Sequence, residues 1–79
     1  MNAARRTRIR KIATELSGFQ KSLETIADSE QEILDGRSEA FLDSERGDEA
    51  QEAIDFVEAA SLSVKEAIRY LTKVCGPIA

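Results

Sequence analysis

Carboxylates spaced three residues apart are the groups in this chain whose type and spacing suit metal chemistry. Such pairs include Glu32 with Asp35, Glu49 with Glu52, and Glu52 with Asp55. In a helix this spacing places both side chains on one face, and carboxylate oxygens are ligands that Mg²⁺ accepts. Acidic helices also generate such pairs by chance, so a magnesium site is an alternative and not the main prediction.

All-α nucleotide pyrophosphohydrolases hold magnesium with ExxE and ExxD pairs on adjacent helices, and an enzyme of that class is the catalytic alternative. Here Glu32 and Asp35 lie close to the end of the first helix, and two helices are too few for such a site without self-association. The chain contains no histidine, which disfavours the common zinc and iron sites. We therefore predict that the protein is not an enzyme and needs neither metal nor cofactor.

Cys75 is the single cysteine. It cannot form a disulfide within the chain, and no histidine is present to activate it. We expect either a buried small apolar residue or a thiol at a frayed helix end. A lone cysteine and a basic start without an export signal fit a cytoplasmic protein, and no uninterrupted apolar run is long enough to suggest membrane association.

Cations gather near both ends of the sequence. Residues 1–11 carry five of them and no acid, and more follow near the end of the second helix. An antiparallel hairpin brings these regions together, which predicts a rod that is basic at its open end and acidic at its hairpin end. The predicted binding residues are Arg5, Arg6, Arg8, Arg10, Lys11, Arg69, Lys73 and Tyr70.

Positive charge at the start of a helix opposes the helix dipole, so we expect it to serve an interaction. The main prediction is a non-enzymatic oligomeric protein whose basic end binds an acidic or phosphate-bearing partner, such as a host protein. Nucleic-acid binding through the basic N-terminal segment is an alternative, although no aromatic residue separates the arginines. Sequestration of a small signalling nucleotide is another, with Tyr70 stacking on the base.

The second helix, expected over residues 45–75, carries a wide apolar surface. Two neighbouring stripes with steps of three and four run along it: Ala50, Ile54, Val57, Ser61, Val64, Ile68, Leu71 and Cys75, and beside them Ala53, Phe56, Ala60, Ser63, Ala67, Tyr70 and Val74. A surface this wide predicts more than one neighbouring helix.

The first helix is expected over residues 3–35. Its seam follows a heptad spacing through Ile9, Ile12, Leu16, Phe19, Leu23, Ile26, Glu30 and Ile33, and Ala13, Ala27 and Leu34 widen it. Residues 36–44 form the connection, in which Gly36 is expected to adopt a left-handed conformation. Phe41 and Leu42 should close the end of the hairpin, and Ser44 or Asp48 should cap the second helix.

These elements predict one all-α domain, residues 1–79, built as an antiparallel two-helix hairpin. A domain of this size rarely encloses a sufficient core alone. Since neither a disulfide nor a metal is expected, self-association is the remaining means of stabilisation. We predict a homo-oligomer, either a dimeric four-helix bundle or a larger bundle of hairpins.

The sequence Ser44-Glu45-Arg46-Gly47 joins the connection to the second helix. Together with the run 29–32 and the Glu-Ala-Ile-Asp of the second helix, it resembles a group of short helical-hairpin proteins of bacteria and their phages or other mobile elements, a group with no assigned activity. The resemblance covers residues 30–71, and it depends on capping and heptad residues. The group's usual proline in the connection is Ser38 here. The resemblance implies a helical hairpin and transfers no functional residue.

Overall fold

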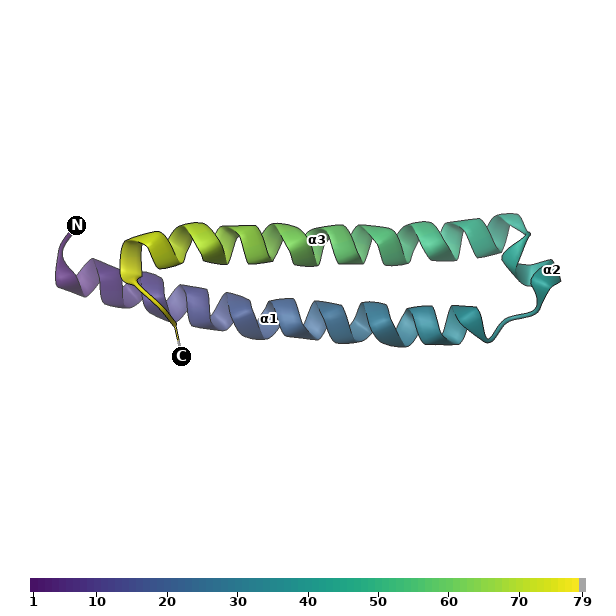
Figure 1. Ribbon diagram of the computed structural model, residues 1–79, viewed down its shortest axis with the longest axis horizontal. Helices are drawn as coiled ribbons and strands as arrows, with labels where there is room; N and C mark the ends of the chain where they lie inside the picture. The colour runs from purple at the N-terminus through teal and green to yellow at the C-terminus, as the bar shows by residue number, and fades with distance from the viewer. Residues whose placement is uncertain (79) are drawn as a thin grey trace.

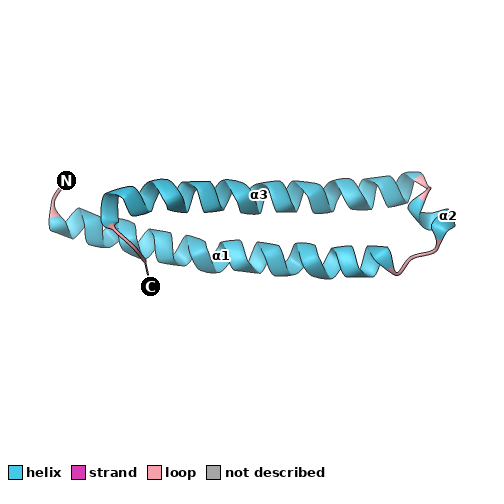
Figure 2. Ribbon diagram, in the orientation of Figure 1, coloured by secondary structure: helices cyan, strands magenta, loops and turns pink. Residues whose placement is uncertain are grey.

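The computed structural model describes residues 1–78 as three helices: α1 (Ala3–Asp35), α2 (Glu39–Leu42) and α3 (Glu45–Cys75). The long helices α1 and α3 lie side by side and antiparallel in a rod 58 Å long, with α2 at one end and both termini towards the other (Figure 1). No strand occurs among these residues (Figure 2). The all-α prediction is confirmed, and α2 is a single helical turn within the connection.

Serine hydroxyls cap the N-termini of α2 and α3. The Oγ of Ser38 accepts a hydrogen bond from the Phe41 amide at 3.2 Å, and the Oγ of Ser44 accepts one from the Gly47 amide at 3.2 Å. Each hydroxyl satisfies a backbone N–H that has no partner within its own helix. Of the two predicted caps for α3, Ser44 is therefore the correct one.

Gly36 does not adopt the expected left-handed conformation, because its φ is −82°. The Gly36 amide donates to the carbonyls of Glu32 and Ile33 at 3.3 and 3.2 Å, and the Arg37 amide donates to Leu34 at 2.9 Å. These bonds satisfy the last carbonyls of α1 while the chain stays right-handed. Among the described residues, Gly76 is the one residue with a positive φ, and it lies where α3 ends.

One row of residues from each long helix forms the contact between α1 and α3. The members of each row are buried and lie seven residues apart or a multiple of seven. The row on α1 is Ala13, Gln20, Ala27 and Leu34, and the row on α3 is Gly47, Ile54, Ser61 and Cys75. A seven-residue repeat that faces a partner helix is the pattern of packing at a shallow crossing angle.

This contact corrects the seam predicted for α1. The large side chains of Ile12, Phe19, Ile26 and Ile33 are 50–64% exposed, whereas the residues expected only to widen the seam are enclosed. Small side chains on the contact row let two helices approach closely, and two helices can enclose little beyond that row. The bulky residues that flank it therefore stay at the surface.

The enclosed core is small and lies towards the closed end. Ala27, Leu34 and Ile54 form it, and the half-buried Phe41 packs against them. Leu42 keeps 37% of its surface exposed, so only one of the two residues expected to close the hairpin does so. No large side chain among residues 1–78 is completely buried.

A polar pair interrupts the contact row near the middle of the rod. The Nε2 of Gln20 donates to the Oγ of Ser61 at 3.0 Å, and both residues are buried. A slip of one helix against the other would leave the amide and the hydroxyl without their partner in a region closed to water. The pair therefore favours the observed register, as single polar residues do in coiled coils.

We expect Ser61→Ala to lower the free energy of unfolding by about 1–3 kcal/mol, because it leaves a buried amide without a partner. Gln20→Leu combined with Ser61→Ala should recover most of that loss. Urea unfolding followed by circular dichroism measures both effects, and Ser63→Ala at an exposed position of the same helix is the control. If Ser61→Ala and Ser63→Ala lowered the free energy of unfolding equally, the Gln20–Ser61 hydrogen bond would not stabilise the fold as proposed.

The two glycines within the long helices should respond oppositely to alanine. A Cβ at Gly18 meets nothing within 4 Å, whereas one at Gly47 would lie 2.7 Å from the Leu42 carbonyl oxygen. We expect Gly18→Ala to stabilise the protein by up to about 1 kcal/mol through helix propensity. Gly47→Ala should lower the melting temperature, because the connection must move. Thermal unfolding in which both variants shift in the same direction would refute this prediction.

Candidate functional site

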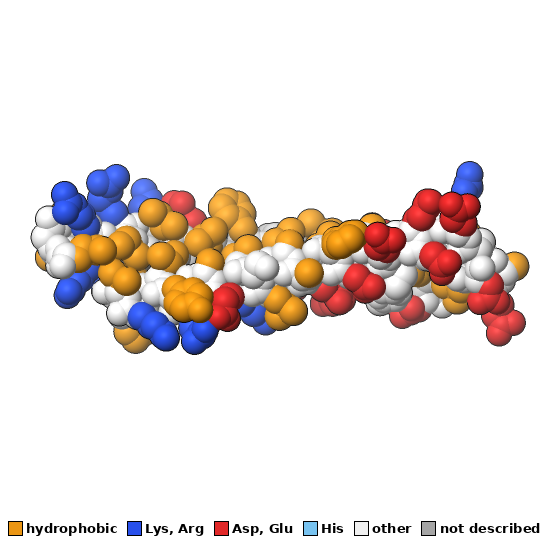
Figure 3. Space-filling view, turned by 90° about the horizontal axis from the view of Figure 1, so that it is seen from above, with side chains coloured by type: hydrophobic (Ala, Val, Ile, Leu, Met, Phe, Trp, Pro, Cys, Tyr) orange, Lys and Arg blue, Asp and Glu red, His pale blue; other side chains and the backbone are white. Residues whose placement is uncertain are grey.

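The two ends of the rod carry opposite charge (Figure 3). Cations cover the end that holds the termini, and acids cover the end that holds α2. The first turn of α1 contains no acid and its last turn no base, whereas α3 begins with Glu45 and Asp48 and has Lys73 in its last turn. The charges of α3 thus complement its dipole, whereas α1 has no such charges in its first and last turns.

We call the set Arg5, Arg6, Arg8, Arg10, Lys11, Arg69 and Lys73 the basic end. Its α1 cations are exposed, and the first turns of α1 extend past the end of α3 (Figure 1). Within residues 1–78, the side chains of Arg5, Arg6, Arg8 and Lys11 make no hydrogen bond or ion pair with another residue. Their charges are therefore available to a partner.

Arg10 has a different position in the basic end. Its guanidinium donates to the backbone carbonyl of Cys75, the last residue of α3. Carbonyls at a helix C-terminus lack partners within the helix, and a cation there also complements the dipole. Cys75 is itself buried, in line with one of the two outcomes expected for it. Arg10 thus joins the open ends of the two long helices.

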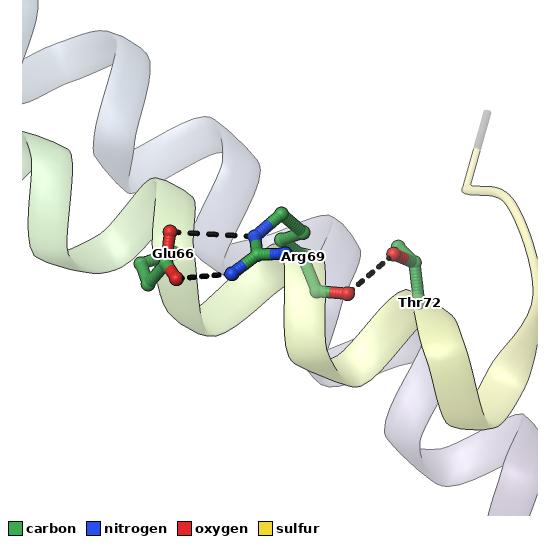
Figure 4. Close-up of polar contacts among 3 residues, drawn as sticks. All are labelled: Glu66, Arg69 and Thr72. Carbon is green, nitrogen blue, oxygen red and sulfur yellow. Dashed lines mark hydrogen bonds and ion pairs between the residues drawn. The ribbon is translucent and has the colours of Figure 1, made fainter.

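The α3 cations surround Tyr70, which is 56% exposed. The Arg69 guanidinium lies 4.9 Å from the centre of its ring and the Lys73 ammonium 5.7 Å away, both within the range of cation–π attraction. Arg69 also pairs with Glu66, with its Nε 3.3 Å from Oε2, and its carbonyl accepts from the Thr72 hydroxyl at 2.9 Å (Figure 4). Glu66 thus neutralises part of this cluster.

A shallow groove of about 270 Å³ lies beside two of the free arginines. Its lining is Met1, Arg5, Arg8, Ile9 and Ile12, with no residue of α3. The predicted binding residues therefore share one end of the rod but form two patches. One is a cationic groove on α1, and the other is the group of cations around Tyr70 on α3.

The carboxylate pairs do not converge on a common centre. In the described part of the chain, no three acidic or cysteine side chains come together closely enough to hold a metal ion. The pairs therefore stay separate on the helix surfaces. Neither long helix contains an apolar stretch long enough to cross a membrane, within the residues that the structure describes.

No match to this chain was found among protein-family models, curated proteins or solved structures. The case for a function therefore depends on the geometry and the charges of the chain itself.

An extended apolar surface covers one flank of the hairpin, and we call it the apolar face. It consists of two heptad rows on each long helix, in which every residue except Glu30 is apolar. One row on α1 is Ile9, Leu16, Leu23 and Glu30, and the other is Ile12, Phe19, Ile26 and Ile33. The rows on α3 are Ala50, Val57, Val64, Leu71 and Ala53, Ala60, Ala67, Val74. A groove of about 320 Å³ on this flank lies between Ile26 and Ile33 of α1 and Ala53 and Val57 of α3.

The opposite flank is polar. Gln31 and Gln51 exchange hydrogen bonds between their amides at 2.9 and 3.1 Å, and Lys65 pairs with Glu24 at 2.9 Å. The hairpin is therefore amphipathic across its thickness. The two stripes of the second helix indicated a wide apolar surface, and the seam predicted for α1 contains the residues that form the α1 half of this flank. That seam lies beside the rows of α3 on the surface instead of between the two helices.

The two ion pairs alter the titration of their acids. Hydrogen bonding to Lys65, with a smaller contribution from Gln20, lowers the pKa of Glu24. Hydrogen bonding to Arg69 lowers the pKa of Glu66, and the same contact raises the pKa of Arg69. A lowered folded-state pKa stabilises the fold above the ordinary pKa of the acid, and this stabilisation is lost as the pH falls through the lowered value.

We expect Lys65→Gln to raise the pKa of Glu24 towards its ordinary value without moving that of Glu66. Arg69→Gln should do the reverse, so each variant serves as the control for the other. Carboxyl carbon chemical shifts followed by NMR through the acidic range measure both titrations. If both acids moved together in either variant, the pairs would not be the local cause of the shifts.

Proposed function

We propose that this chain is a non-enzymatic, self-associating interaction protein whose basic end binds an acidic or phosphate-bearing partner. One observation carries the proposal: exposed cations at the projecting start of α1 have no partner among the described residues and lie where the helix dipole disfavours them. The proposal includes a cytoplasmic location and an origin in a bacterium, phage or other mobile element.

Arginine is suited to this role because its guanidinium forms charge-assisted hydrogen bonds to carboxylates and phosphates. Several cations at one end of a rod also steer an anionic partner towards that end. The groove beside Arg5 and Arg8 adds the apolar side chains of Met1, Ile9 and Ile12. This combination favours a partner that presents acidic and apolar groups together, as the surface of an acidic protein does.

Nucleic acid is the second candidate, because the cation density at the start of α1 suits a phosphate backbone. The acidic closed end would repel the rest of a long strand, which favours the acidic-protein partner instead. A small nucleotide could use the exposed ring of Tyr70, although Arg69 and Lys73 already lie near that ring.

The proposal is tested with fluorescently labelled probes: an acidic peptide containing apolar residues, a single-stranded oligonucleotide and a nucleoside triphosphate. Binding is measured by polarisation at two salt concentrations. We expect the acidic peptide to bind, and the combined change Arg5→Gln, Arg6→Gln, Arg8→Gln to weaken it about tenfold or more, because it removes three charge-assisted contacts. Affinity for the oligonucleotide that falls steeply with salt would instead favour nucleic acid.

The matched control removes three cations away from the basic end, through Lys21→Gln, Arg37→Gln and Arg46→Gln. It changes the net charge by the same amount, so a general electrostatic effect would weaken binding equally in both variants. Circular dichroism verifies that both remain folded. Unchanged binding after loss of Arg5, Arg6 and Arg8 would overturn the assignment of this end as the binding site.

A further inference from the structure

We propose that the apolar face of one hairpin packs on the apolar face of a second copy whose long axis runs in the opposite direction. In this dimer the basic end of each copy lies on the acidic closed end of the other. The inference rests on the proposed function for its charge pairing, and it deepens that function by naming a partner of the basic end, namely another copy of this chain.

The first support is the mismatch between the apolar surface and the core that one chain encloses. Ile12, Phe19, Ile26 and Ile33 recur every seven residues along α1, and each is at least half exposed. The buried core of the single hairpin contains only Ala27, Leu34, Ile54 and a few other residues. Scattered exposed apolar residues are ordinary, but a continuous apolar flank indicates an interface.

The second support is area. The rows of the apolar face span residues 9–33 on α1, about 36 Å at 1.5 Å per residue, and the rod is 17 Å broad. The face thus covers on the order of 600 Å² on each copy and about 1,200 Å² for two, which reaches the lower limit of stable, specific interfaces. A dimer formed through the polar flank would have the same breadth, but it would bury the polar and charged side chains of Gln51, Glu24 and Lys65.

Charge decides the relative direction of the two copies. Residues 24–58 contain thirteen acids and two bases, whereas residues 1–11 contain five bases and no acid. Two copies pointing the same way would place closed end on closed end and basic end on basic end. The opposite direction replaces both repulsions with attractions, and the ends carry enough charge for this difference to select one arrangement.

The middle of the apolar face lies near the level of the Gln20–Ser61 hydrogen bond, and a two-fold axis at that level gives the largest overlap. α1 then packs on α1 of the second copy. Phe19 lies beside the axis, and Ile12 of each copy is level with Ile26 of the other. α3 packs on α3, where Ala60 lies beside the axis and small side chains permit a close approach. Glu30, the one charge on the face, lies towards the basic end of the other copy.

Part of the basic end stays accessible in this dimer. Arg69 follows Leu62 by seven residues, and Leu62 lines a groove of the polar flank together with Glu24 and Glu58. Arg69 therefore points away from the apolar face. The dimer would cover the groove beside Arg5 and Arg8 and leave the cations of α3 free for a further partner.

Sedimentation in the micromolar range tests the interface. We expect the wild type to sediment at twice the 8.7 kDa chain mass. Phe19→Glu should weaken dimerisation about a hundredfold or more, because it places two like charges beside the two-fold axis. Leu62→Glu is the matched control, since Leu62 and Phe19 are 65% and 64% exposed in the single chain but lie on opposite flanks. If Phe19→Glu fails to fold, the wild type must show an unfolding midpoint that rises with protein concentration.

Spin labels test the direction. In a Cys75→Ser background, single cysteines replace Asp35, near the closed end, or Lys21, near the proposed axis. Opposed copies should separate the two Asp35 labels by about 45 Å along the rod, at 1.5 Å per residue, and keep the Lys21 labels near the same level. Short distances at both positions would show copies that point the same way and would overturn the proposal.

A wild type that stays monomeric and helical, a mass of four copies or more, or equal dissociation by Phe19→Glu and Leu62→Glu would also overturn it. None of these results removes the proposed function, because binding of the labelled acidic peptide is measured separately on the dissociated chain, in which the groove beside Arg5 and Arg8 is open. Loss of peptide binding by the dissociated chain would overturn the function and leave the dimer standing.

Discussion

The structure depends on the close packing of one residue row of α1 against one row of α3. Both rows repeat every seven residues, and small side chains such as Ala13, Ala27 and Gly47 allow the approach. Two helices in contact enclose little more than such a row, so the bulky residues that flank it remain outside. The apolar face is therefore a direct consequence of how the hairpin closes, and no large side chain among the described residues is completely buried.

Several polar contacts fix where along the rod the two rows meet. The Gln20–Ser61 hydrogen bond sets the register in the middle. Ser44 caps α3 at the closed end, where the absence of a side chain at Gly47 lets the connection pass. At the open end, Arg10 holds the last carbonyl of α3. A slip of either helix would break the Gln20–Ser61 and Arg10–Cys75 contacts, which join α1 to α3 at two levels of the rod, whereas the Ser44 cap is local to the start of α3.

Charge and apolar surface are arranged along different directions of the same rod. Charge changes sign along its length (Figure 3), whereas polarity changes across its thickness, from the apolar face to the flank that holds the Gln31–Gln51 and Lys65–Glu24 contacts. The apolar face offers contact area but does not favour either relative direction of two rods. The charged ends favour one direction but add little contact area. An apolar contact surface and complementary charge are the two features that a specific association uses.

The sequence by itself determined the two long helices, their bounds and the separation of charge, and it narrowed the cap of α3 to Ser44 or Asp48, because these depend on local periodicity, on breakers and on the order of charges along the chain. It did not determine which of the apolar rows of α1 would meet α3, nor that Gly36 would stay right-handed. It also did not show that the arginines would divide between a cationic groove and a contact with Cys75. In an isolated helix, nothing distinguishes one apolar row from another row of similar hydrophobicity. Only the packing of two helices, limited by side-chain size, decides which row is enclosed and which stays at the surface.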